Sequence, residues 1–202
     1  MNESVLFVTD FNEKIPGTLQ AIDSQYFDIR KLFQDIVENG INSAFLLRVK
    51  HPEACFKQIK ASVKVIGAAG GLVKNANAEY LFIERLGKWD LPKGKVEPDE
   101  KMAETAVREV EEECGVTVDK LGEKIRSTYH VYILRGDFII KKTNWYHMSV
   151  AGVPDLIPQK EEDIQQALWV KPEDFASLLS NTYPLIKEMV LDLFPHVTLT
   201  DQ

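Results

Sequence analysis

One helix pattern in the middle of the chain, with strand patterns on both sides of it, constrains the fold most strongly. The helix is predicted over residues 98–114, and its apolar residues gather on one side, which must therefore face a core: Ala103, Ala106, Val107 and Val110. The strand patterns cover residues 62–75, 79–85, 124–134, 144–153 and 167–170. Two more helices are predicted at 171–180 and 183–194. This order predicts an α/β fold with helices packed on a mixed sheet.

Residues 1–60 predict a separate small α/β piece. Strand patterns occur at 5–9 and 43–49, and helix patterns at 23–40 and 51–61. The expected organisation is an N-terminal extension, 1–60, followed by a second domain, 62–202. The extension carries no recognisable chemical motif, so it could serve dimerisation, cover a substrate or bind a partner.

The charge balance excludes some partners. The chain has 202 residues, a net charge of −7 and a pI of about 5.2, which argues against a general nucleic-acid or anionic-membrane binder. A local basic pocket for a small anion stays compatible with these numbers. The longest apolar run, 65–73, is too short to span a bilayer, and the N-terminus lacks a signal-peptide pattern. We therefore expect a cytoplasmic protein with no membrane partner.

Three carboxylates on the central helix suggest a metal site. Glu109, Glu112 and Glu113 have the spacing i, i+3 and i+4, so they share one helix face, whereas Glu111 falls outside it and is expected to be solvated. Their mutual repulsion and the helix dipole disfavour this arrangement near a helix C-terminus. A solvated acidic face is one interpretation. A divalent cation such as Mg²⁺, which prefers oxygen ligands, would relieve the repulsion.

The surrounding sequence, "GKVEPDEKMAETAVREVEEECGV" at 94–116, resembles the Nudix box. Every specified position of that motif is filled: Gly94, Glu100, Arg108, Glu109, Val110, Glu112, Glu113, Gly115 and Val116. The resemblance extends more loosely over 62–170 and does not cover 1–60. It implies the α/β/α sandwich with a mixed sheet that is typical of Nudix hydrolases.

The same resemblance implies an activity and roles for the residues. Nudix hydrolases cleave a nucleoside diphosphate linked to another group X, and they use Mg²⁺, with Mn²⁺ as an alternative. Glu109, Glu112 and Glu113 correspond to the metal ligands. Arg108 is expected to orient one of them by a charge-assisted hydrogen bond, and the absence of a side chain at Gly94 would let the loop approach the helix. Glu100 lies near the helix start, where its role is expected to be mainly structural, and help to catalysis is the alternative. Together, Glu109, Glu112, Glu113, Arg108 and Glu100 are the candidate catalytic residues.

The loop before the helix indicates the substrate class. "LPKGKVEPDE" at 91–100 resembles the loop of diadenosine-tetraphosphate hydrolases, so Lys93, Gly94 and Lys95 are candidates for binding a polyphosphate. Tyr132, sixteen residues after Val116, has the place of a tyrosine typical of dinucleoside-polyphosphate enzymes, although a packed strand residue is the alternative. We expect a nucleotide substrate. ADP-ribose or nucleotide-sugar hydrolysis and a non-catalytic ligand sensor are the alternative functions.

The proton acceptor has no clear motif. The late segment "QKEEDI" offers Glu161 and Glu162 as a base or extra metal ligand, and a solvated loop is the alternative. A homodimer is also compatible with the sequence.

Overall fold

The computed structural model describes residues 4–15 and 17–199. The chain divides into two compact units. The first comprises residues 1–65 together with 131–140, and the second comprises residues 66–130 and 141–202.

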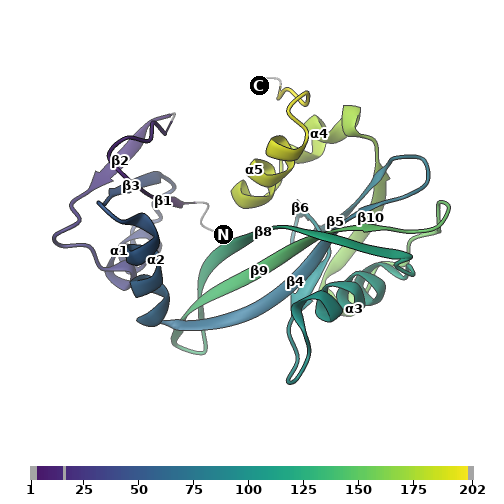
Figure 1. Ribbon diagram of the computed structural model, residues 1–202, viewed down its shortest axis with the longest axis horizontal. Helices are drawn as coiled ribbons and strands as arrows, with labels where there is room; N and C mark the ends of the chain where they lie inside the picture. Colours follow the sequence, from purple (N-terminus) through teal and green to yellow (C-terminus); the bar gives the residue numbers. More distant parts are fainter. Residues whose placement is uncertain (1–3, 16, 200–202) are drawn as a thin grey trace. The chain divides into compact units, whose positions relative to one another are not determined.

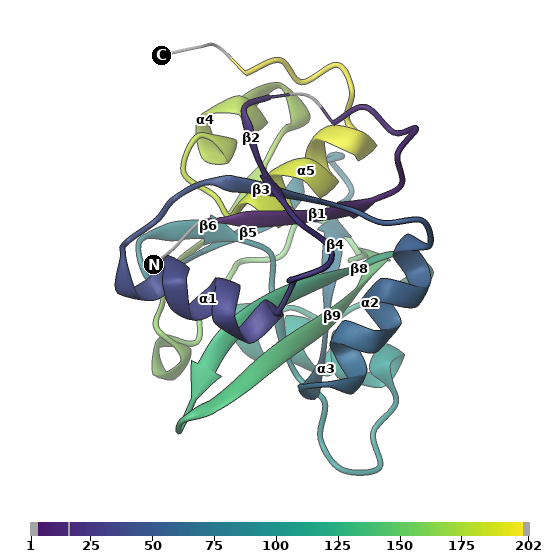
Figure 2. The ribbon, with the colours of Figure 1, turned by 90° about the vertical axis from the view of Figure 1, so that its left-hand side faces the viewer.

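The first unit contains a small parallel sheet, with strand order β1-β3-β2. Both of its helices lie on one side of that sheet (Figure 1, Figure 2). Its elements are β1 (Val5–Thr9), β2 (Leu19–Ile22), α1 (Ile29–Glu38), β3 (Ala44–Arg48) and α2 (Pro52–Ala61). The predicted small α/β extension is therefore confirmed.

Two predictions in this unit need correction. The helix expected at 23–40 is shorter, because the Asp28 side chain accepts hydrogen bonds from the Arg30 and Lys31 amides and so fixes the N-terminus. Strand β2 was not predicted, since four residues with only two partly buried side chains give little alternation to recognise.

The second unit is built on a mixed sheet whose main strands follow the order β10-β5-β4-β9-β8. Two short strands extend it, β6 on β5 and β7 on β4. The strands are β4 (Lys64–Lys74), β5 (Tyr80–Arg85), β6 (Lys88–Asp90), β7 (Lys93–Lys95), β8 (Lys120–Leu134), β9 (Asp137–Ser149) and β10 (Ile164–Val170). The segment predicted as a plain loop, 86–98, therefore contains two strands, each too short for a sequence pattern.

Helices cover both faces of this sheet, with α3 (Met102–Cys114) on one face and α4 (Phe175–Leu179) and α5 (Pro184–Leu193) on the other (Figure 1). A hydrophobic core lies on each face of the sheet, and alternating residues of β4 belong to one or the other, because strand side chains alternate between faces. Val73 belongs to the same core cluster as Val110 of α3, whereas Leu72 belongs to the cluster that contains Phe175 of α4. The predicted α/β/α sandwich is confirmed.

Helix α3 begins later than expected, at Met102 instead of 98. The Lys101 amide donates to the Glu104 carboxylate, which closes the first turn. The helix ends as predicted at Gly115, whose φ of 68° is the left-handed conformation that glycine adopts readily. None of the helices within residues 4–15 and 17–199 has the length and apolar character that a membrane span requires.

Candidate functional site

The loop strand β7 lies directly against the acidic face of α3. Gly94 pairs with Ala69 of β4, and a Cβ added to Gly94 would lie 1.8 Å from Glu109 Oε2. Only glycine therefore allows the backbone and this carboxylate to occupy their positions together. Burial raises the pKa of Glu109 above its ordinary value, while the Arg108 guanidinium opposes that rise.

Glu113 is the most deeply buried carboxylate of the cluster, with 1% of its side chain exposed. It accepts a hydrogen bond from the Lys93 backbone amide at 2.8 Å, and Arg85 Nη1 lies 3.4 Å from its other oxygen. Burial raises the pKa of Glu113 to about 7, although the charges of Lys93 and Arg85 act against the rise. A buried carboxylate with a raised pKa is typical of a functional site.

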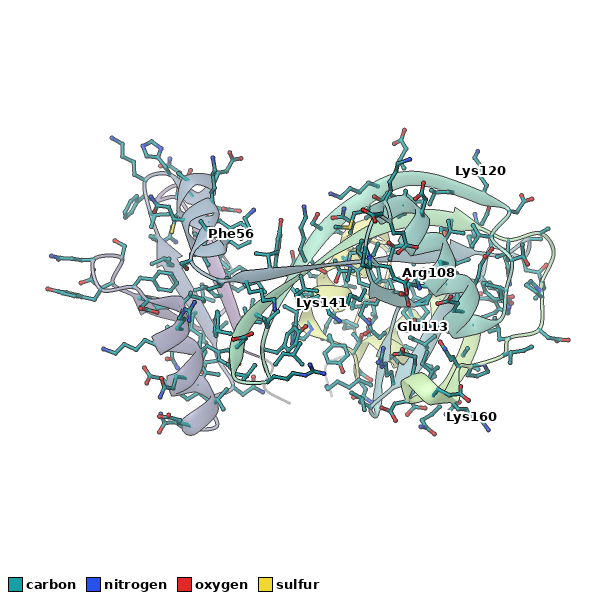
Figure 3. The ribbon with its side chains drawn as sticks, turned by 90° about the horizontal axis from the view of Figure 1, so that it is seen from below. Phe56, Arg108, Glu113, Lys120, Lys141 and Lys160 are labelled. Carbon is teal, nitrogen blue, oxygen red and sulfur yellow. The ribbon has the colours of Figure 1, made fainter. Side chains whose placement is uncertain are left out.

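Arg108, which is labelled in Figure 3, forms ion pairs with three carboxylates of the site. Its Nε and Nη2 donate to the two oxygens of Glu100 at 2.8 and 2.9 Å, which is a bidentate pair. Its Nη1 lies 2.8 Å from both Glu109 Oε1 and Glu112 Oε2. Its Nη2 also donates to the Lys95 carbonyl at 3.2 Å. The hydrogen bonds to these carboxylates hold the pKa of Arg108 above its ordinary value, and the bond to Glu100 has the largest effect. Arg108 thus holds three carboxylates and the loop together.

Glu100 is held in its charged form at the start of the helix. Besides its pair with Arg108, it accepts a hydrogen bond from the buried Thr105 hydroxyl at 2.6 Å and from the Glu97 amide at 3.2 Å. The bonds from Arg108 and then Thr105 lower the pKa of Glu100 to about 2. Its contacts are those of a residue that anchors Arg108.

The residues fit a divalent cation by their chemistry. Within 4–15 and 17–199, no three His, Cys, Asp or Glu side chains converge tightly enough to enclose an ion as they stand. Glu109 and Glu112 nevertheless both approach one positive atom, Arg108 Nη1, so their oxygens can share a cation. Together with Glu113 they supply hard carboxylate oxygens on one helix face, which suits Mg²⁺ or Mn²⁺.

The two candidate bases are in different environments. Glu162, in a short 3₁₀ turn at Lys160–Glu162, forms an ion pair with Arg85 Nη2 at 2.8 Å. Since Arg85 also contacts Glu113, it joins the late turn to the acidic cluster. Glu161 is exposed. The structure therefore brings Glu162, and not Glu161, to the cluster.

Of the remaining predicted residues, Lys93 and Lys95 lie in the loop strand β7, and Tyr132 lies in β8. The Lys93 ammonium pairs with the buried Asp90 carboxylate at 2.5 Å, and the Lys93 backbone amide donates a hydrogen bond to the Glu113 carboxylate. The Lys95 side chain is exposed. Tyr132 lies in the part of β8 that belongs to the first unit, whereas the carboxylate cluster lies within the second.

Sequence reasoning missed three participants: Arg85, Asp90 and Thr105. Asp90 was visible as an acid beside a Pro-Lys-Gly loop, but Arg85 gave no signal because its partners are 28 and 77 residues away. The expectation that Glu111 is simply solvated is wrong. Its carboxylate accepts the Val118 amide at 2.9 Å and so supports the turn after α3.

Comparison with known proteins identifies the family of the chain. The NUDIX domain family profile matches residues 65–193. An RNA pyrophosphohydrolase from Erythrobacter litoralis is 25% identical over 115 residues, which are 50% of this chain and 70% of that protein. A CTP pyrophosphohydrolase from Escherichia coli is 34% identical over 92 residues, 45% of this chain and 61% of that protein, which is less than two thirds of its length.

Solved structures give the same result for the fold. A MutT protein from Methanosarcina mazei Go1 has a TM-score of 0.50 and 26% identity, covering 66% of this chain and 95% of that one. An Ap4A hydrolase from Caenorhabditis elegans has a TM-score of 0.50 and 20% identity, covering 65% and 96%. The resemblance inferred from residues 94–116 is confirmed, and the chain belongs to the Nudix family of hydrolases, which act on phosphoric anhydride bonds.

Proposed function

We propose that this protein is a Mg²⁺-dependent pyrophosphohydrolase of nucleoside polyphosphates, with dinucleoside polyphosphates favoured. One observation carries the proposal. The buried Glu113 carboxylate is held by the amide of Lys93, so an anionic metal site and a cationic loop meet at one point. A polyphosphate and a divalent cation together neutralise both charges.

The residues have distinct tasks in this reaction. Glu109, Glu112 and Glu113 would hold Mg²⁺ or Mn²⁺. The bound metal would stabilise charge on the phosphate oxygens and lower the pKa of water. Arg108 keeps Glu109 and Glu112 oriented through hydrogen bonds of 2.8 Å.

In this proposal Glu162 is the general base that accepts a proton from the attacking water. Its carboxylate reaches the cluster through Arg85 and is about half exposed, so it is open to solvent.

Support for the substrate class comes from the names of two relatives, an RNA and a CTP pyrophosphohydrolase. The loop at 91–100 resembles that of diadenosine-tetraphosphate hydrolases, and this resemblance supports the preference for dinucleoside polyphosphates. The same proposal includes the small-molecule nucleotide partner and the cytoplasmic location that the sequence predicts, with residues 1–60 as a separate extension.

A substrate panel tests the proposal. Diadenosine tetraphosphate, CTP, ATP and ADP-ribose are incubated with the full chain in Mg²⁺, in Mn²⁺ and in EDTA, and products are separated by ion-exchange chromatography. We expect metal-dependent cleavage of diadenosine tetraphosphate at the highest kcat/KM. Cleavage of ADP-ribose alone would favour the alternative pyrophosphatase, and no cleavage of any compound would contradict an enzymatic role.

Two matched variants test whether activity requires the proposed metal ligand Glu113 or only the negative charge of the helix. Glu113→Gln removes one charge of the cluster and should lower kcat by about 100-fold or more, since it removes charge from the site that stabilises the transition state. Glu111→Gln lies two residues away, keeps an oxygen for the Val118 amide and should leave kcat unchanged. Equal activity of the two variants would contradict the assignment of Glu113.

A further inference from the structure

Arg85 lies outside the Nudix motif at 94–116 and connects the acidic helix to a late turn of the chain. It is the last residue of β5, and 28% of its side chain is exposed. Its Nη2 donates to Glu162 Oε2 at 2.8 Å, and its Nη1 lies 3.4 Å from Glu113 Oε1. One guanidinium therefore lies between a proposed metal ligand and the proposed base.

The position of Arg85 on its strand places it on the face of the sheet that α3 covers. Ile83, two residues earlier on β5, belongs to the same core cluster as Val110 of α3. Since strand side chains alternate between faces, Arg85 points to the same face as Ile83. The strand thus aims the guanidinium at the carboxylates of α3, in agreement with the contact to Glu113.

The late segment is also anchored to α3 by its backbone. The Gln159 amide donates to the Glu113 carbonyl at 3.0 Å, which satisfies an acceptor that the end of the helix leaves open. The chain then forms the turn Lys160–Glu162, which Lys160 marks in Figure 3. Glu113 is therefore tied to this segment twice, through its carbonyl to Gln159 and through its carboxylate and Arg85 to Glu162.

The two contacts of Arg85 differ in strength. The 2.8 Å bond to Glu162 has the length of a strong charge-assisted hydrogen bond, whereas 3.4 Å to Glu113 exceeds the usual range. The other oxygen of Glu113 is held by the Lys93 amide at 2.8 Å. A buried carboxylate requires positive charge nearby, and Arg85 supplies it to Oε1. The contact with Glu113 is therefore the one that a stronger cation can replace.

We propose that a divalent cation displaces Arg85 from Glu113, and that Arg85 stays bonded to Glu162 and so holds the late turn beside the metal site. The inference rests on the metal site of the proposed function. Arginine suits this task, because its planar fork presents separate N–H groups to two carboxylates. A purely structural ion pair is the alternative, and it predicts no competition between Arg85 and the cation.

Competition predicts that metal binds more tightly once the charge of Arg85 is removed. The test is calorimetric titration of the full chain with Mg²⁺ alone at about pH 9, which is above the Glu113 pKa of about 7 and so limits competition by protons. We expect Arg85→Gln to bind Mg²⁺ about tenfold more tightly, because two like charges no longer meet at Glu113. Arg85→Lys retains the charge and should bind like the wild type.

Hydrogen exchange of residues 157–163, measured by mass spectrometry, tests the hold on the late turn. Arg85→Gln should raise the exchange rate about two- to fivefold, the value of one partly exposed ion pair. Glu162→Gln should have the same effect, and the double variant should show no further increase, since both changes remove one interaction. Mg²⁺ should not raise the rate in the wild type, because the bond to Glu162 remains.

Arg126 provides a matched control. It also pairs with two carboxylates, Glu188 at 3.6 Å and Asp192 at 2.6 Å, and 34% of its side chain is exposed. Both partners belong to α5, which covers the other face of the sheet (Figure 1). Arg126→Gln therefore removes the same charge and should change neither the Mg²⁺ affinity nor the exchange of 157–163. Thermal unfolding midpoints show whether each variant is folded.

Several results would overturn the role of Arg85. They are unchanged or weaker Mg²⁺ binding by Arg85→Gln, equal tightening in Arg126→Gln or in Arg85→Lys, and unchanged exchange of the late turn in Arg85→Gln. Faster exchange of the wild type in Mg²⁺, or a further increase in the double variant, would also overturn it.

The outcomes separate this inference from the proposed function. If Arg85→Gln binds Mg²⁺ more tightly but the substrate panel shows no turnover, the role of Arg85 stands and the enzymatic proposal fails. If turnover occurs and Arg85→Gln binds Mg²⁺ like the wild type, the enzyme stands and the role of Arg85 fails. A wild type that binds no Mg²⁺ overturns the metal site and this inference together.

Discussion

Replacing Gly94 by alanine should inactivate the site through a single displaced carboxylate. The added Cβ would lie 1.8 Å from Glu109 Oε2, whereas ordinary contact begins at 3.4 Å, so the carboxylate must move by 3.4 − 1.8 = 1.6 Å. That shift exceeds the slack of the 2.8 Å bond between Glu109 and Arg108. Because a misplacement of about 1 Å at a catalytic centre costs roughly 100-fold in rate, we expect kcat to fall by at least about 100-fold.

The assay is the initial rate of diadenosine tetraphosphate hydrolysis in Mg²⁺, with thermal unfolding as a check of the fold. Since the clash is with the end of a flexible side chain, the cost in stability should stay within about 1–3 kcal/mol. Gly67→Ala, on the adjacent β4, is the matched control. Its Cβ would meet Met102 Cε at 2.8 Å, also the end of a flexible side chain, but one outside the carboxylate cluster.

A double-mutant cycle identifies the cause of the loss. If Gly94→Ala acts by displacing Glu109, it should have no further effect in a Glu109→Ala background, which is a strongly non-additive result. Wild-type activity in Gly94→Ala would refute the reasoning. An equal loss in both backgrounds would show that the loop itself, and not the carboxylate, is what alanine disturbs.

The remaining predictions concern stability. The pKa of Glu113 is raised from 4.5 to about 7 in the folded protein. The free energy of unfolding of the metal-free protein should therefore fall by about 3 kcal/mol as the pH rises from 4.5 through 7, because the buried carboxylate then has to ionise. Glu113→Gln should remove this pH dependence, which urea unfolding at about pH 5–8 measures. Glu100 behaves oppositely: its pKa of about 2 means that its bond to Arg108 stabilises the fold above pH 4.5 and is lost toward pH 2, and unfolding of Glu100→Gln should approach the wild type there. Gly70→Ala would place Cβ 2.2 Å from the Pro92 carbonyl, which is backbone, so we expect a fall in Tm of several degrees; an unchanged Tm would contradict the packing.

Much of the fold followed from periodicity. The alternating strands, the amphipathic face of α3 and the helices that close the chain were predictable because each pattern is local to its element. Short pieces escaped prediction. Strand β2 and the loop strands β6 and β7 have three or four residues each, and they exist because neighbouring strands provide hydrogen-bond partners.

The acidic site was likewise encoded locally. Glu109, Glu112 and Glu113 lie on adjacent turns of one helix, so their spacing alone predicts a shared face. The depth at which Glu113 is buried was not encoded in this way. It results from the Lys93 amide and the sheet beneath α3.

The sequence by itself determined the family, the α/β/α fold and the acidic face of α3, because all three depend on residues close together in the chain. Only the tertiary structure decided which residues join that face. Arg85 meets Glu113 and Glu162 from 28 and 77 residues away. Strand order and register set these contacts, and a sequence pattern reports neither.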